Sequence, residues 1–304
     1  MLNIIIGAVA LGLLWALMTT GVFLTYKILD YADLSVEGSI VMGAAIAAKL
    51  ITSGMNPIPA TILAFAGGLI AGVVTGVLNT KLKIPGLLAG ILTMIALYSV
   101  NVRIMGKANI TLLKSETIFT MINPTGKGGN IDVIITAVVI NVALIYALYW
   151  FFGTEVGCAV RATGDNEKMA RAQGVNTDNM KILALALSNG FVALSGALIA
   201  QYQSYSDVSM GQGSIVIGLA SVIIGEVLFY RGNFLNRLFA VTLGAVVYRI
   251  IIALVLEMGM NPTDLRLFTA ITVAICLVLP NVLSQAKVKI AGITDKKSAD
   301  MEEK

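Results

Sequence analysis

The stretch GCAVRATGDNEKMARAQG, residues 157–174, is the most informative part of this chain because it is polar and stands between two long apolar runs. Its charged side chains are Arg161, Asp165, Glu167, Lys168 and Arg171. We expect a short helix from Asp165 to Gln173, with Asn166 or Asp165 capping its first turn and Gly174 ending it in the left-handed conformation. A capped polar helix between two membrane spans indicates a docking element for another protein. The alternative is an ordinary solvated loop helix.

The composition of the chain indicates an integral membrane protein. Hydrophobic residues make up 57% of the 304 residues, and charged residues make up only 12%. A soluble domain typically has about 45–50% apolar and about 25% charged residues. The net charge of +4 does not indicate nucleic-acid binding, because the basic residues are scattered between apolar runs. We therefore predict an all-α, polytopic helical bundle in the lipid bilayer.

Apolar runs long enough to cross about 30 Å of hydrocarbon predict about nine transmembrane helices, within a range of eight to ten. They cover residues 2–26, 36–53, 58–79, 86–102, 131–152, 182–201, 214–230, 236–256 and 267–284. The second and fourth runs are short, so one of them is a candidate for a broken or re-entrant helix. The membrane domain is predicted to cover residues 1–285, followed by a charged tail, residues 286–304.

The distribution of Lys and Arg predicts the orientation of the bundle. Fourteen of them fall in one set of alternate loops, six fall in the other set, and Arg249 lies within a span. Because positive charge favours the cytosolic side, the loop 153–181 and the C-terminal tail are expected in the cytosol. The N-terminus and the loop 103–130 are expected outside.

Small residues recur along several spans. Gly68, Gly72 and Gly76 are spaced by four residues in the third span, and such a ridge lets two helix backbones approach closely. We interpret these glycines as packing positions, which do not indicate where the substrate binds.

Residues for catalysis and metal binding are scarce. The chain has no histidine, which excludes Ser-His-Asp hydrolysis and most zinc chemistry. We predict no catalytic residue, no metal site and no cofactor. An intramembrane enzyme that holds magnesium through Asp30, Asp33 and Glu37 would require a second acidic cluster, and the only other local one, Asp165 with Glu167, is interrupted by basic residues.

Two segments resemble a known family. Residues 157–175, followed by Lys181-Ile182-Leu183-Ala184, resemble the cytoplasmic coupling segment of permeases in the branched-chain amino acid and ribose group of ABC importers. Residues 33–39, DLSVEGS, resemble an element that these permeases carry after an early span. The resemblance extends to about residue 285, and the subgroup it matches best is the permease for tryptophan and tyrosine uptake.

The resemblance implies a multi-pass permease subunit of the cell membrane (plasma or inner membrane). Such a permease moves a small solute, here an aromatic or branched-chain amino acid, that an extracellular or periplasmic binding protein delivers. A separate cytosolic ATP-binding subunit would hydrolyse ATP, since no G-x-x-x-x-G-K-[ST] motif occurs in this chain. The permease is expected to form a homodimer. The alternative is a secondary transporter or channel that uses no ATPase.

Carried over to this sequence, the resemblance implies a set of ATPase-coupling residues in the loop 153–181. They are Arg161, Gly164, Asp165, Asn166, Glu167, Ala170, Arg171 and Gly174.

Polar residues within the spans are candidates for the substrate pathway. Arg249 lies deep in the eighth span, where its guanidinium could attract a substrate carboxylate or hold helices together. The other candidates are Ser35, Ser39, Asn101 and Asn189, although hydrogen bonding between helices is the commoner use of such groups. Outside, an amphipathic stretch from Ile110 to Ile122 either receives the binding protein or packs over the mouth of the bundle.

Overall fold

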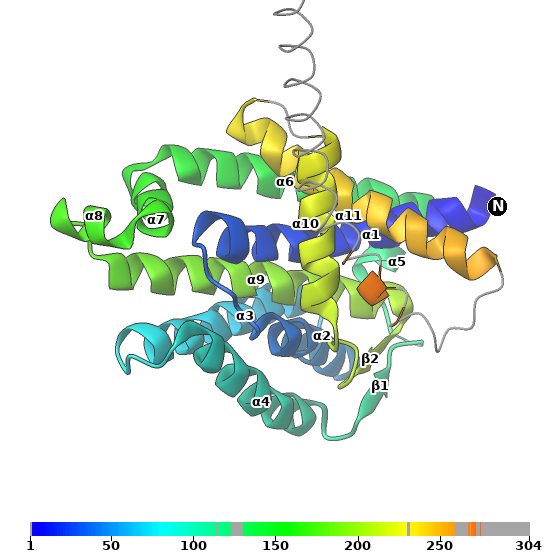
Figure 1. Ribbon diagram of the computed structural model, residues 1–304. Helices are drawn as coiled ribbons and strands as arrows, with labels where there is room; N and C mark the ends of the chain where they lie inside the picture. Colours follow the sequence, from blue (N-terminus) through cyan, green and yellow to red (C-terminus); the bar gives the residue numbers. More distant parts are fainter. Residues whose placement is uncertain are drawn as a thin grey trace, which may run out of the picture.

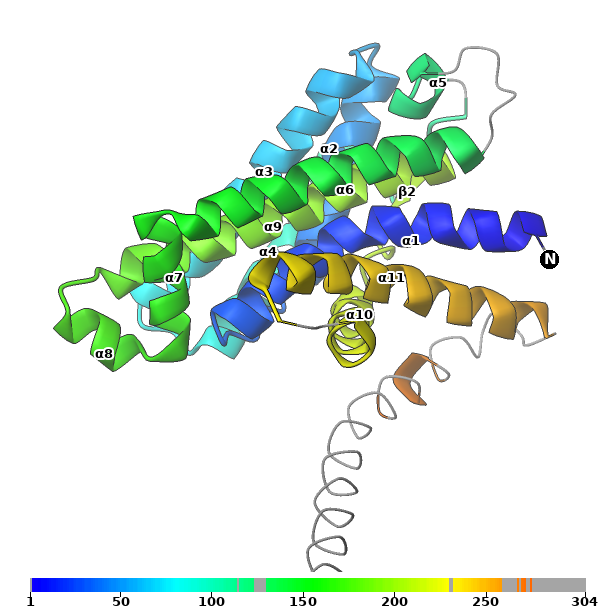
Figure 2. The ribbon, with the colours of Figure 1, turned by 90° about the horizontal axis from the view of Figure 1, so that it is seen from above.

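The computed structural model describes residues 2–113, 115–122, 130–229 and 232–258, together with 267, 269–271 and 274. Most of its helices run side by side, and the N-terminus lies at the end of the bundle opposite α8 (Figures 1 and 2). The long helices are α1 (Leu2–Phe23), which continues as the π-helical turn η1 (Leu24–Ile28), α3 (Pro57–Thr80), α4 (Gly86–Met105), α6 (Asn130–Gly153), α9 (Thr177–Gln203) and α11 (Phe234–Glu257). The shorter elements are α2 (Val36–Thr52), β1 (Asn109–Thr111), α5 (Ile118–Ile122), α7 (Glu155–Asp165), α8 (Glu167–Ala172), β2 (Tyr205–Asp207) and α10 (Ser214–Phe229).

The predicted polytopic helical bundle is confirmed. Six helices of the described residues are long and apolar enough to cross a membrane: α1 with η1, α3, α4, α6, α9 and α11. The predicted spans 36–53 and 214–230 form the shorter helices α2 and α10. The ninth predicted span, residues 267–284, lies largely outside the described residues, as does the tail 286–304.

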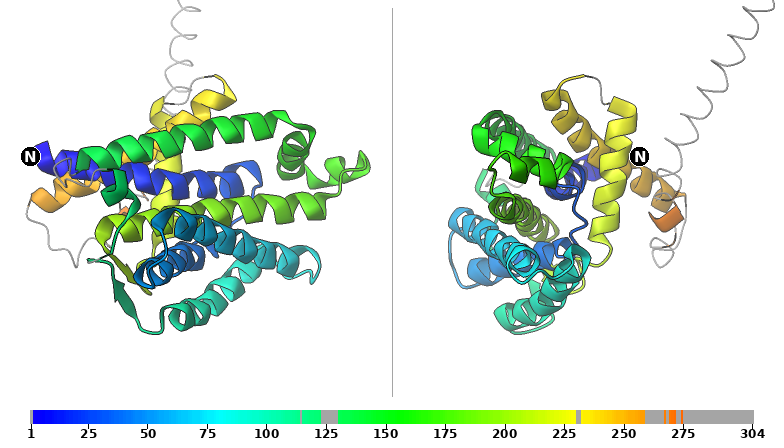
Figure 3. Two further views of the ribbon diagram at one scale, coloured as in Figure 1. Left: turned by 180° about the vertical axis from the view of Figure 1, so that it is seen from behind. Right: turned by 60° about the vertical axis from the view of Figure 1, so that its left-hand side comes forward.

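Helix α9 is the central element of the bundle. It is the most buried of the six long helices and packs against α1, α2 and α3 (Figure 3). Its start is fixed by Asn176, whose side chain accepts a hydrogen bond from the backbone N–H of Asn179. It ends at Ser204, which has a left-handed backbone with φ 60°.

Polar side chains join the helices where the bundle is buried. Ser188 donates to the carbonyl of Gly21 at 2.7 Å, and Ser195 donates to that of Leu14 at 2.8 Å, so α9 is bonded twice to α1. Asn141 of α6 likewise donates to the α1 carbonyl of Leu13 at 2.9 Å. In a membrane, apolar contacts between helices gain little over contacts with lipid. These hydrogen bonds therefore help to determine which helices pack together.

The glycine ridge of α3 is a packing surface, as predicted. A methyl group added at Gly68 would collide with the carbonyl oxygen of Asn189, and one added at Gly72 would collide with that of Leu185. Only glycine lets α3 lie this close to the α9 backbone.

Of the two short runs that were candidates for a broken or re-entrant helix, the second forms α2, an unbroken helix of 17 residues. Its first turn lies beside Asn189, because Ser39 donates a hydrogen bond to the Asn189 side chain and the Ser35 hydroxyl is 3.1 Å from the same oxygen. Asn189 is twelve residues after Thr177 and fourteen before Gln203, so it marks the middle of α9. Helix α2 therefore begins about halfway along the bundle. Residues 29–35, which precede it, are not helical and return from the end of η1 to this depth.

Helix α10 differs from the predicted span in its direction. It runs across the long helices and is seen end-on in Figure 2. Its 16 residues make it about 24 Å long at 1.5 Å per residue, less than the hydrocarbon thickness. Its position depends on packing against α11 and α1.

The stretch from Ile110 to Ile122, which was expected to lie outside, is not one amphipathic helix. It is divided into the strand β1, which pairs antiparallel with β2, and the short helix α5. Ile110, Leu112 and Phe119 are buried, and the backbone N–H of Ile118 donates to Gln201 of α9. These contacts fit packing over the end of the bundle, the second of the two uses predicted for this stretch.

Candidate functional site

The polar stretch between α6 and α9 forms a projection made of two helices, where a single helix from Asp165 to Gln173 was predicted. Asp165 ends α7, and the extended backbone of Asn166 breaks the helix before α8 begins. Asn166 is the cap, because its side-chain oxygen accepts a hydrogen bond from the N–H of Met169 at 3.0 Å. Gly174 has φ 87°, which confirms the predicted left-handed stop.

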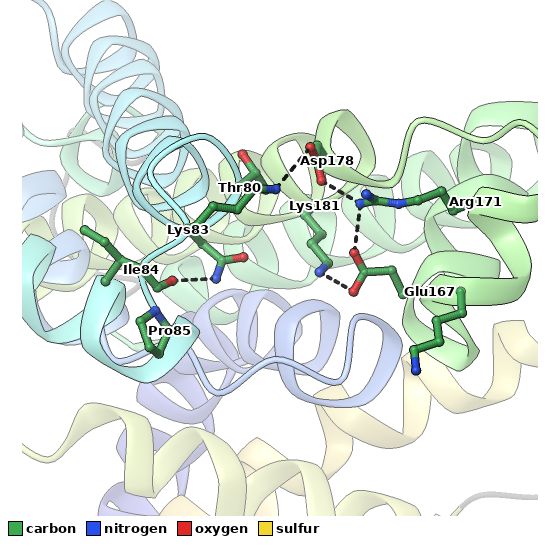
Figure 4. Close-up of a pocket in the computed structure, with 10 residues that line it drawn as sticks. Thr80, Lys83, Ile84, Pro85, Glu167, Arg171, Asp178 and Lys181 are labelled. Carbon is green, nitrogen blue, oxygen red and sulfur yellow. Dashed lines mark hydrogen bonds and ion pairs between the residues drawn. The ribbon is translucent and has the colours of Figure 1, made fainter.

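A network of charges joins α8 to the first turns of α9 (Figure 4). Glu167 pairs with Lys181 at 2.6 Å, and Arg171 pairs with Asp178 at 2.9 Å and with Glu167 at 3.2 Å. Arg171 also donates to the hydroxyl of Thr177 at 2.6 Å. The short helix is thus held to the central helix at both of its ends.

The hydrogen bond from Lys181 is the main cause that lowers the pKa of the Glu167 carboxyl below its usual range. The folded state therefore gains from this pair above the ordinary pKa of glutamate and loses that gain as the pH falls through the lowered pKa.

A cavity of about 460 Å³ lies next to this network, between the α3–α4 connection and α8. Lys83 from that connection is 3.9 Å from Asp178 and lines the cavity. Lys168, which also lines the cavity, and Met169 are exposed on α8, while Ala170 is fully buried. The projection therefore presents a cation and an apolar side chain next to partly exposed ion pairs.

Two of the predicted coupling residues lie on α7 and contact other helices. The Arg161 guanidinium carbon stands 5.5 Å from the centre of the Phe234 ring at the start of α11. A methyl group added at Gly164 would collide with the carbonyl of Ile28 at the end of η1. Asp165 is the last residue of α7, and the other five residues, Asn166, Glu167, Ala170, Arg171 and Gly174, belong to α8 and its two ends.

The structure brings three predicted pathway residues together in the middle of the bundle. Ser39 donates to the Asn189 amide oxygen at 2.6 Å, and Ser35 stands 3.1 Å from the same atom. The Asn189 amide nitrogen donates to Asp33 at 2.8 Å. Asp33 also accepts hydrogen bonds from the backbone N–H and the hydroxyl of Ser35.

All four side chains of this cluster, Asp33, Ser35, Ser39 and Asn189, are buried. We call these residues the Asn189 cluster. Because its polar groups are bonded to one another, the cluster fixes α2 against α9.

Asn101 and Arg249 lie elsewhere. Asn101 of α4 donates to the carbonyl of Gly38 at 3.0 Å, next to the start of α2. The Arg249 guanidinium carbon stands 4.0 Å from the centre of the Trp15 ring, so it joins α11 to α1. A cation over an indole face is attractive, and more so when water is excluded. The position of Arg249 fits a role in helix packing. A contact between Arg249 and the substrate stays a prediction.

A second charge cluster lies near the α8 end of the bundle. Glu226 of α10 pairs with Arg237 at 2.5 Å and with Lys27 of η1 at 3.2 Å. Glu226 therefore joins α10 to both α11 and η1. Arg237 also stands over the ring of Phe23, with 5.1 Å between its guanidinium carbon and the ring centre.

Sequence reasoning missed several members of these clusters. Thr177 and Asp178 could have been found, because they follow the cap Asn176 directly and so fall in the first turn of α9. The roles of Lys83 and Asp33 could not be found from local pattern. Each depends on a contact with a helix far away in the sequence.

Comparison with known proteins agrees with these features. The family described as the permease component of branched-chain amino acid transport systems matches residues 4–279. The chain is 42% identical over 277 residues to the tyrosine transport system permease protein of Clostridioides difficile (strain R20291), covering 91% of each protein.

Other relatives are less similar. An uncharacterised protein of Rickettsia prowazekii (strain Madrid E) is 31% identical over 280 residues, covering 91% of this chain and 97% of that protein. The ribose import permease protein of Escherichia coli (strain K12) is 24% identical over 238 residues, covering 78% of this chain and 70% of the relative. No solved structure matches this chain.

The Asn189 cluster generates a stability prediction. Replacing Asn189 by Leu leaves the buried Asp33 carboxylate and the Ser39 hydroxyl without their amide partner, and each such group costs about 1–3 kcal/mol. We expect a clearly lower melting temperature of the detergent-purified protein, measured by the loss of its monodisperse gel-filtration peak after heating.

The matched control is Ser39→Ala, which removes only one hydrogen bond and is expected to cost about 1 kcal/mol. Equal melting temperatures for Asn189→Leu and the unmodified protein would show that the cluster does not hold α2 in place.

Proposed function

Because this chain belongs to the family of permease components of branched-chain amino acid transport systems, we propose that its cargo is an aromatic amino acid, with tyrosine as the first candidate. The chain is the multi-pass membrane permease of an ABC importer, located in the cell membrane. Such a permease works with an ATP-binding subunit and a substrate-binding protein. The proposal of tyrosine is supported by the 42% identity to a tyrosine transport permease, against 24% to a ribose permease.

In this proposal, α8 is the element that docks on the ATP-binding subunit. The observation that carries it is the charge network from α8 to α9: Glu167 and Arg171 bond to Lys181, Asp178 and Thr177. A partner that moves the exposed side of α8 would therefore move the central helix as well. The middle of α9 in turn holds the start of α2 through Asn189.

The α8 end of the bundle is cytosolic in this proposal, and the N-terminus is outside. The excess of Lys and Arg in the loops of one side supports this orientation. The finer count of nine spans, with residues 267–284 as the last, and the homodimer are parts of the same proposal. A second copy is the commonest partner of a membrane subunit with no sister chain assigned.

The orientation can be tested with a cysteine of the chain itself. Cys158 lies on α7 and is exposed. In a Cys276→Ala background, we expect a membrane-impermeant maleimide to label Cys158 in inside-out vesicles and to leave it unlabelled in intact cells. Labelling in intact cells would place the projection outside and would contradict docking by a cytosolic ATPase.

The function itself is tested by reconstitution of the complete importer. The permease, its ATP-binding subunit and its substrate-binding protein are placed in proteoliposomes, and uptake of radiolabelled tyrosine, leucine and ribose is compared. We expect ATP-dependent uptake of tyrosine above that of leucine, and none of ribose. Native mass spectrometry of the same preparation counts the permease copies, and two are expected.

Uptake driven by an ion gradient without ATP would contradict the proposal, and so would preferred uptake of ribose. The same assay on Arg249→Gln separates the two uses of that residue. A lower melting temperature with an unchanged KM for uptake indicates packing on Trp15, and a raised KM indicates contact with the substrate.

The mechanical role of the charge network is tested by a double-mutant cycle. Glu167→Gln and Lys181→Met each remove one side of a partly exposed ion pair, and such pairs contribute at most about 1 kcal/mol. We therefore expect each variant to lower the amount of solute moved per ATP hydrolysed by about two- to fivefold. The double variant is expected to move as much solute per ATP as the less active of the two single variants, because either single substitution already removes the ion pair.

The control for this cycle is Asn179→Ala, which changes an exposed side chain on the same turn of α9 outside the network. Strictly additive effects of the two substitutions would show that Glu167 and Lys181 act independently.

A further inference from the structure

A cavity of about 410 Å³ lies at the side of the bundle, away from α8. Its walls come from α2, α4 and the segment between β2 and α10, and its lining includes Glu37, Val41, Met94, Tyr98 and Asn101. This volume is within the range of about 300–1,000 Å³ that is usual for small-molecule sites. Its lining combines apolar side chains with a few polar groups, which is also typical of such sites.

The cavity lies at the mid-depth of the bundle. Glu37 is on the first turn of α2, between Ser35 and Ser39, and both of these serines contact Asn189 at the middle of α9. An ionisable side chain at this depth is expensive in lipid, so it faces protein or a water-filled path and marks a functional position by default.

The charge of Glu37 is only partly balanced. Its carboxylate accepts a hydrogen bond from the backbone N–H of Gly213 at 2.9 Å and another from Ile215, at the start of α10. A helix N-terminus carries about half a positive charge. In the part of the chain that the structure describes, no Lys or Arg forms an ion pair with Glu37. Net negative charge therefore remains at this wall.

Asn101 provides an independent observation. Its side chain is 1% exposed, and its amide nitrogen donates to the carbonyl of Gly38. Its amide oxygen is buried and has no hydrogen-bond partner among the described residues. A buried acceptor without a hydrogen-bond donor is energetically unfavourable, and a donor that reaches it removes this cost. Asn101 is among the residues that line the cavity, and a small shift of its amide would bring this oxygen to the donor of a molecule bound there.

From these two acceptors we propose that the cavity binds the primary ammonium group of an amino acid on its way through the permease. Glu37 balances the charge of the ammonium and the Asn101 oxygen accepts one of its hydrogens. The side chain of the solute lies against Met94, Val41 and the largely exposed ring of Tyr98. This inference rests on the proposed function and deepens it, because a sugar offers neither the positive charge nor the apolar surface.

The experiment measures equilibrium binding to the permease in complex with its ATP-binding subunit, purified in nanodiscs. Three probes that share the 4-hydroxyphenyl group are compared: L-tyrosine, tyramine, which lacks the carboxylate, and 3-(4-hydroxyphenyl)propionate, which lacks the ammonium. We expect tyrosine and tyramine to bind and the propionate to bind at least about tenfold more weakly, since a hydrogen bond to a charged group is lost. This expectation concerns the unmodified complex and needs no variant.

Variants then assign the contact. Glu37→Gln keeps an oxygen for the N–H of Gly213 but removes the charge, so the difference between tyramine and the propionate should fall to about threefold or less, since most of the charge-assisted part is gone. Asn101→Leu should weaken tyrosine and tyramine alike. Leu92→Ala is the matched control, because Leu92 is exposed on α4 and lies outside the cavity lining. Gel filtration with the ATP-binding subunit confirms assembly of each variant.

Outcomes that overturn the site differ from those that overturn the function. If the reconstituted importer takes up tyrosine but the propionate binds as tightly as tyramine, the ammonium site is wrong and the proposed function stands. The same conclusion follows if an assembled Glu37→Gln complex keeps full discrimination. If the unmodified importer carries only ribose, the proposed function fails and the site inference fails with it.

Discussion

The hydrogen bonds of Asn189 are the constraint on which the rest of the structure depends. In a bilayer every buried polar group must find its partner within the protein, because no water is available. Asn189 meets this requirement for three segments at once, since it bonds Asp33 before α2, Ser39 within α2 and the carbonyl of Leu185 in its own helix. The start of α2 cannot leave the middle of the bundle unless Asp33 and Ser39 lose these partners together.

This constraint gives α9 its mechanical importance. The same helix that holds α2 at mid-depth also carries Thr177, Asp178 and Lys181 at its other end, where they bond to α8. The α3 glycine ridge keeps α9 in contact with a third helix along its length. Helix α9 therefore connects an exposed projection with the buried polar centre through hydrogen bonds and ion pairs at both places, and this connection is the basis of the proposal that the two move together.

The sequence allowed the bundle to be predicted because span formation depends on local properties. Apolar length defined α1, α3 and α9, and the polar cap and the glycine stop defined α8. The short run at 36–53 was also one of two candidates for a broken or re-entrant helix, and it forms the short helix α2, which begins halfway along the bundle. The direction of α10 could not be predicted, because it depends on contacts between segments far apart in the sequence, such as its packing on α1 and the hydrogen bond between Glu37 and Gly213, 176 residues apart. The split of the polar stretch into α7 and α8 depends on the extended backbone of Asn166, which the sequence offered as one of two caps without indicating that a second helix precedes it.

The two short helices have a common physical explanation. Helix α2 begins at mid-depth beside Asp33, and α10 begins there beside Glu37, so two helix N-termini meet in the region where a spanning helix would run straight through. Each positive end receives a carboxylate of this chain, and the two carboxylates differ in their surroundings. Asp33 is enclosed by Ser35 and Asn189, whereas Glu37 borders a cavity. Irregular backbone at membrane depth is tolerated where it is buried in protein or lines a water-filled path. The enclosed carboxylate thus serves the fold, and the bordering one is the group that a solute at this depth would meet.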